Sequence, residues 1–112
     1  MKEKLYILWT NADEITSEKM VLMYATNAMK NNWWDEITVI VWGSSNKLIE
    51  ESDLIKEKIK KAMSFGVNFS ACKACADQLN TSSILEELGV ELKYWGVGLT
   101  AILKDNEKII TV

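Results

Sequence analysis

The 112-residue sequence predicts one α/β domain, spanning residues 1–112, in which a mainly parallel five-stranded sheet lies between two layers of helices, an arrangement of flavodoxin-like appearance. Two observations lead to this prediction. Short apolar or β-branched runs alternate with helical patterns along the whole chain, and the connections between them are short. Such alternation favours parallel strands joined by right-handed crossover helices, although it leaves the order of the strands open.

The first strand is expected at residues 5–9, because a short continuous apolar run suits a strand that is buried on both faces. A helix should follow from Thr16 or Ser17, either of which is a good cap, to about Asn31. The residues expected on its buried stripe are Met20, Val21, Met23, Tyr24, Ala25, Ala28 and Met29. Residues 37–42, which are rich in β-branched side chains, predict the second strand.

The middle of the chain predicts a short helix at residues 47–51 and a longer one that is capped by Asp53 and ends near Phe65. Gly66 is placed where a left-handed residue ends a helix. The buried stripe of the longer helix should consist of Leu54, Ile55, Ile59, Ala62 and Met63. Residues 67–71 then predict the third strand.

After the third strand, residues 72–79 predict a helix, and Ser83 and Glu86 have the spacing of a capping box for another helix that Gly89 ends. The remaining elements are a strand at residues 90–94, a loop at 95–98, a short helix at 99–104 and a final strand at 108–112.

Missing residue types exclude several classes of function. The chain has no His, which removes His-dependent nucleophile pairs and the commonest metal ligand. All 13 basic residues are Lys and the net charge is −3, so a nucleic-acid partner is not expected. No run is long enough to span a membrane and no signal peptide is visible, so we expect a cytoplasmic protein with reduced cysteines and no membrane partner.

Both cysteines follow the third predicted strand. Cys72 is expected at the strand end, open to solvent, with the N–H groups of the next helix nearby to lower its thiol pKa. Ser70 is a candidate cap for that helix, and Lys73 adds a cation that could also pair with Asp77. The residues alone favour a nucleophilic thiolate at Cys72 no more than a small buried side chain. Cys75, one helical turn later, either assists Cys72 by forming a disulfide or packs under the helix.

Ligands and chemistry gather beyond the carboxyl ends of the strands in such sheets. Four loops meet this description, and three of them carry or adjoin a Trp. The candidate binding residues in these loops are Thr10, Asn11, Trp42, Gly43, Ser44, Ser70, Lys73, Trp95 and Gly96. No cofactor is expected, because the first loop lacks glycine and Gly96 with Gly98 is more typical of a turn. No metal is expected either, since two thiolates make only half of a zinc site unless a symmetric oligomer supplies the rest.

Three segments, at residues 41–45, 71–79 and 88–96, resemble the DsrE/DsrF-like sulfur-relay family in order and spacing. The resemblance covers nearly the whole chain, although Ser44 stands where the family commonly has Pro. It implies an α/β/α domain with five strands, homo-oligomers such as trimers or hexamers, and a cysteine that carries sulfur as a persulfide. The family's usual cysteine corresponds to Cys72, whereas Cys75 belongs to some members only.

Two functions therefore remain open. In the first, the chain is a cytoplasmic sulfur carrier, akin to a sulfurtransferase, with Cys72 and Cys75 as its catalytic residues. It would exchange sulfur with a donor or acceptor protein or a small thiol. In the second, it is a non-catalytic oligomeric subunit that binds a small molecule or partner and whose cysteines are structural. Trp33 and Trp34 are adjacent in a connection rich in polar residues, and one subunit cannot easily bury both, which also favours a subunit interface.

Overall fold

The sheet has five parallel strands in the order β4-β3-β2-β1-β5, in a computed structural model that describes residues 2–112. This confirms the predicted α/β class with its parallel five-stranded sheet. The strands are β1 (Lys4–Trp9), β2 (Glu36–Val41), β3 (Asn68–Cys72), β4 (Glu91–Lys93) and β5 (Ile109–Thr111). In the central register, Ile7 pairs with Val39, and Val39 pairs with Phe69.

Helices fill every connection between strands. The segment between β1 and β2 contains α1 (Glu14–Thr16), the π-helix η1 (Ser17–Leu22) and α2 (Met23–Lys30). The others are α3 (Ser45–Glu51), α4 (Asp53–Ser64), α5 (Lys73–Gln78), α6 (Ser82–Leu88) and α7 (Trp95–Lys104). In the described residues 2–112, no helix is both long and apolar enough to cross a membrane.

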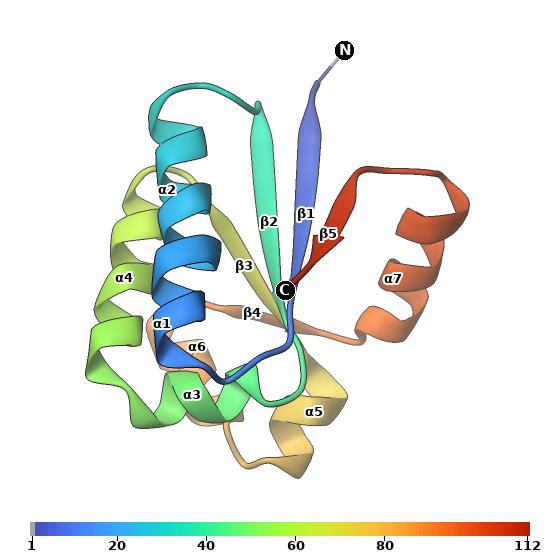
Figure 1. The fold of residues 1–112 in the computed structure, drawn as a ribbon. Helices are drawn as coiled ribbons and strands as arrows, with labels where there is room; N and C mark the ends of the chain where they lie inside the picture. The colour runs from blue at the N-terminus through green and yellow to red at the C-terminus, as the bar shows by residue number, and fades with distance from the viewer. Residues whose placement is uncertain (1) are drawn as a thin grey trace.

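The strand order determines which face each helix covers. From β1 to β4 each strand is added on the same side of the one before, so right-handed crossovers place their helices on one face. The chain then returns to the far side of β1 as β5, and this reversal places α7 on the opposite face. Figure 1 shows α1 to α4 on one side of the sheet, α7 on the other, and α5 beyond the strand ends.

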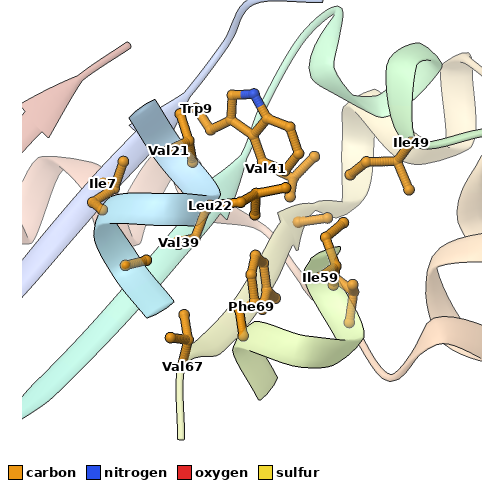
Figure 2. Packing of buried hydrophobic residues seen from close by; sticks show 14 of the residues in the cluster. Ile7, Trp9, Val21, Leu22, Val39, Val41, Ile49, Ile59, Val67 and Phe69 are labelled. Atoms are coloured by element: carbon orange, nitrogen blue, oxygen red, sulfur yellow. The ribbon is translucent and has the colours of Figure 1, made fainter. Parts of the chain in front are cut away.

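The larger hydrophobic core lies under α2, α4 and α6. Figure 2 shows its centre, where Trp9 and Leu22 pack beside Val41, and where Phe69 lies near Ile59. A smaller core lies under α7 and consists of Ile40, Cys72, Trp95 and Ile102.

Helix starts were predicted less well than helix positions. The first helical segment is capped by Asp13, whose carboxylate accepts a hydrogen bond from the Thr16 backbone N–H at 2.8 Å, and neither Thr16 nor Ser17 has that role. Likewise α4 is capped by Ser52, which accepts from the Ile55 N–H at 3.1 Å, and Asp53 is already helical. In both cases more than one good cap residue lies near the helix start, and the cap is the one whose side chain accepts from the backbone N–H three residues later.

The predicted capping box at Ser83 and Glu86 was wrong, because α6 begins earlier, at Ser82, and its N-cap Thr81 makes no side-chain capping bond. The helix ends were predicted correctly. Gly66 and Gly89 have φ of 98° and 95°, a left-handed conformation that glycine adopts without strain.

Three residues of the predicted buried stripes are exposed. Met20 and Met23 are 36% and 49% exposed, because the π-helical segment turns Val21 and Leu22 towards the sheet and leaves the methionines beside them. Leu54 is 39% exposed, since it lies in the first turn of α4 next to Ile55, which occupies the core.

Candidate functional site

The loops that follow β1, β2 and β3 meet at the carboxyl edge of the sheet, as the sequence predicted. Ser44 donates a hydrogen bond from Oγ to the Thr10 carbonyl at 2.9 Å, and this bond joins the first two loops. Ser45 is fully buried and donates to the Trp9 carbonyl at 2.7 Å. Ser45 was not predicted as a site residue, and its place in a Ser-rich loop after a strand was the available signal.

Cys72 is the last residue of β3 and the N-cap of α5. It is 5% exposed and packs with Ile40, Trp95 and Ile102. The expectation of an open Cys72 thiol was therefore wrong. The cause is α7, which crosses the same face of the sheet and covers the strand end.

Cys75 lies one helical turn further on, is partly exposed, and contacts the same small core. The pKa of Cys75 is raised above the ordinary 9.0, first by burial and also by the neighbouring Cys72 thiol, whereas the Gly43 backbone N–H lowers it. The two sulfurs are thus neighbours, with Cys72 beneath and Cys75 nearer the surface. Both are free thiols.

Lys73 is paired with Asp77, four residues later, as the spacing predicted. Its Nζ lies 2.8 Å from Asp77 Oδ2 and 5.9 Å from the centre of the Tyr94 ring. Asp77 also accepts a hydrogen bond from Ser82 Oγ at 2.6 Å. Both hydrogen bonds lower the pKa of Asp77, and the bond from Lys73 has the larger effect. The ammonium of Lys73 therefore helps to hold α5 in place.

Ser70 is not the helix cap that was predicted, because its side chain lies inside the sheet face and joins two other elements. It accepts a hydrogen bond from Trp95 Nε1 at 2.8 Å and donates to Glu91 Oε1 at 3.0 Å. Lys93 Nζ lies 4.3 Å from the centre of the Trp95 ring, a cation–π contact. Glu91 and Lys93 were not predicted, although their alternation along β4 places both on one face.

Trp95 and Gly96 open α7, which corrects the predicted loop at residues 95–98. Packing explains the glycine at position 98, because a Cβ there would lie 2.6 Å from Trp95 Cε3. The indole therefore folds back over Gly98, which lets it cover Cys72. Gly96 is exposed and has open space where a Cβ would point.

The other predicted binding residues lie around the carboxyl edge of the sheet and make structural contacts there. Thr10 donates from Oγ1 to the Val112 carbonyl at 3.1 Å, and Asn11 Oδ1 accepts from Ser17 Oγ at 3.2 Å. Trp42 is partly buried against the small core. The structure brings Gly43, Cys72 and Cys75 together, and it places Thr10 and Asn11 in the loop after β1.

A groove of about 450 Å³ lies on the same face of the sheet as Cys72, beside α7. Ser70 and Trp95 are the predicted binding residues that line it. Its other polar lining residues include Tyr6, Glu36, Thr38 and Glu91. Among the described residues 2–112, no three His, Cys, Asp or Glu side chains are arranged to hold a metal ion.

Three solved structures share this architecture. A conserved protein of unknown function from Bacteroides thetaiotaomicron, BT1422, is 35% identical over 98% of this chain and 95% of its own, with a TM-score of 0.96. YchN from E. coli is 15% identical over 100% of both chains, with a TM-score of 0.72, and has the DsrE/DsrF-like fold. MTH1491 from Methanobacterium thermoautotrophicum, of unknown function, is 18% identical over 98% of this chain and 99% of its own, with a TM-score of 0.72. The sequence matches no protein-family model and no curated protein sequence.

Proposed function

The chain belongs to the same family as BT1422 of Bacteroides thetaiotaomicron, and on that premise we propose that it is a thiol-dependent sulfur carrier. The observation that carries the proposal is the meeting of two free thiols, Cys72 and Cys75, at the carboxyl edge of a parallel sheet. The DsrE/DsrF-like fold supports it, because the resemblance of residues 71–79 to sulfur-relay proteins falls on this thiol pair.

The chemistry needs only groups that the site contains. A cysteine thiolate attacks the outer sulfur of a donor persulfide, R–S–SH, and the donor leaves as the thiolate R–S⁻. The protein then holds the sulfur as Cys–S–SH, which the thiol of an acceptor can attack in turn. No histidine, metal or organic cofactor enters these steps. The donor and acceptor are a partner protein or a small thiol in the cytoplasm, where thiols stay reduced.

A homo-oligomer, a trimer or hexamer, is part of the proposal. It is supported by the outer face of α7, where Val97 is 80% exposed and Leu103 is 57% exposed. Trp33, at the end of α2, is 55% exposed. Large apolar side chains on a small domain are typical of surfaces that meet another subunit.

The burial of Cys72 favours a second candidate. With 5% exposure and apolar neighbours, Cys72 also fits a structural role in an oligomeric binding subunit, and the raised pKa of Cys75 disfavours its thiolate at neutral pH. The groove beside Ser70 and Trp95 would then be the binding site.

Mass spectrometry after treatment with inorganic polysulfide separates the two candidates. A sulfur carrier gains one sulfur atom on a cysteine and passes it to an added thiol. A structural subunit gains none, and its thiols react with an alkylating agent only after denaturation. If the variants Cys72→Ala and Cys75→Ala both gain sulfur as the unmodified chain does, neither thiol is the carrier.

A further inference from the structure

We infer that Cys75 receives the sulfur and that Cys72 then displaces it as sulfide by closing a Cys72–Cys75 disulfide. This division of roles rests on the proposed sulfur-carrier function and goes beyond it. It adds an outcome, release of free sulfide, and it assigns the first contact with the donor to Cys75.

The difference in accessibility decides which thiol reacts first. Cys72 is 5% exposed beneath Trp95 and Ile102, so a donor cannot bring its outer sulfur in line with the Cys72 sulfur. Cys75 is partly exposed on the first turn of α5. Burial raises the pKa of Cys75, and the Gly43 backbone N–H partly offsets this. Cys75 is thus the sulfur that an external donor meets.

The contact between the two thiols decides the second step. Cys72 has an extended backbone, with φ −67° and ψ 112°, and Cys75 is the third residue of the helix that follows. This is the Cys-x-x-Cys arrangement at a helix start, in which a disulfide closes readily. The Cys72 and Cys75 side chains pack in the same small core, so the nearest target of Cys72 in a persulfide is the inner sulfur, Cys75 Sγ.

The two steps balance without an external oxidant. In the first, the Cys75 thiolate attacks R–S–SH to give Cys75–S–SH and R–S⁻. In the second, the Cys72 thiolate attacks Cys75 Sγ, the Sγ–S bond breaks, and HS⁻ leaves with the electron pair. The two cysteine sulfurs are oxidised to a disulfide while the transferred sulfur is reduced to sulfide. Two equivalents of a low-molecular-weight thiol then restore the dithiol, with attack at the accessible Cys75 and Cys72 as the leaving group.

The test treats the reduced 112-residue chain with a limiting amount of inorganic polysulfide and measures intact mass and the sulfide released per sulfur atom taken up. We expect the unmodified chain to release sulfide and to end with one intramolecular disulfide. Cys72→Ala should stop at a persulfide on Cys75 and release no sulfide from it. Cys75→Ala should load about tenfold more slowly, because a buried thiol reacts poorly. Loading itself expels sulfide from the polysulfide, so the inference is overturned if Cys72→Ala releases as much sulfide per sulfur atom taken up as the unmodified chain does, or if Cys75→Ala loads at the unmodified rate.

Two controls keep this result apart from the sulfur-carrier proposal and from misfolding. Ser64→Ala, at the exposed end of α4 and outside the candidate site, should behave as the unmodified chain. Cys72→Ser tests the loss of the thiol a second time with a different replacement, and circular dichroism checks that Cys72→Ala and Cys72→Ser are folded. If the unmodified chain takes up no sulfur, the carrier proposal fails, and a small organic disulfide then tests the pair alone. A mixed disulfide on Cys75 that collapses to the Cys72–Cys75 disulfide supports the assigned order, and a mixed disulfide on Cys72 overturns it.

Discussion

The two faces of the sheet are built differently. On the face under α2, α4 and α6, residues such as Ile7, Trp9 and Ile59 are completely buried in one continuous core. On the other face α7 lies over the sheet (Figure 1), and Ala74 and Cys75 of α5 pack beside it on the small core. A groove lined by Ser70 and Trp95 lies next to this small core. The first face supplies most of the apolar burial, and the second contains the thiols, the Trp95 network and the groove. The larger apolar core and the candidate site are therefore separated by the sheet.

Removing side-chain volume from each core gives the largest expected effect. Ile59→Ala should lower the free energy of unfolding by about 2–5 kcal/mol, because its site is enclosed on every side and cannot collapse around the cavity. Ile102→Ala should cost less, near the lower end of that range, since its neighbours border the groove and can relax. Urea denaturation measures both values. An equal or greater loss at Ile102 would contradict the separation of the two faces.

The glycines of α7 test the cover over Cys72. Gly98→Ala should lower the free energy of unfolding by about 1–3 kcal/mol, because the new Cβ displaces the Trp95 ring. The same displacement should speed the alkylation of Cys72. Gly96→Ala is the matched control in the same helix turn. Its Cβ meets open space, so it should stabilise the chain by about 0.5–1 kcal/mol and leave the alkylation rate unchanged.

The hydrogen bond inside the small core gives a smaller effect. Ser70→Ala leaves the buried Trp95 N–H without its acceptor, which should cost about 1–2 kcal/mol in unfolding free energy. Ser44→Ala removes a hydroxyl that bonds the Thr10 carbonyl at the surface and should change stability by less than about 0.5 kcal/mol. Thermal denaturation compares them, and equal losses would show that Ser70 does not hold Trp95.

The smallest effect concerns the exposed side of α5, where Lys73 and Asp77 form an ion pair. The pKa of Asp77 is lowered below its ordinary 3.8, so its interactions with Lys73 and Ser82 stabilise the fold above that pH and are lost as the pH falls through the lowered pKa. An NMR titration of the Asp77 carboxyl carbon should give a midpoint below 3.8. Lys73→Met should move the midpoint upward, and an unchanged midpoint would show that the lysine does not act on Asp77.

The site was predicted in part. Strand ends in a parallel sheet lie at one edge, so residues around Thr10, Gly43 and Cys72 could be expected to meet before any coordinates were known. The burial of Cys72 could not be predicted, because it depends on α7, whose first turn had the composition of a loop. The roles of Ser70 and Gly98 depend equally on where the Trp95 indole lies.

The sequence by itself determined the α/β class, the number of strands, most element positions and the two helix ends at Gly66 and Gly89. These features follow from local periodicity and backbone preference, which a linear pattern records. Only the tertiary structure decided the strand order and, with it, the face that α7 covers. The strand order depends on contacts between residues far apart in the chain. Because α7 covers the end of β3, the Cys72 thiol is buried beneath Cys75 and is not open to solvent as the sequence predicted.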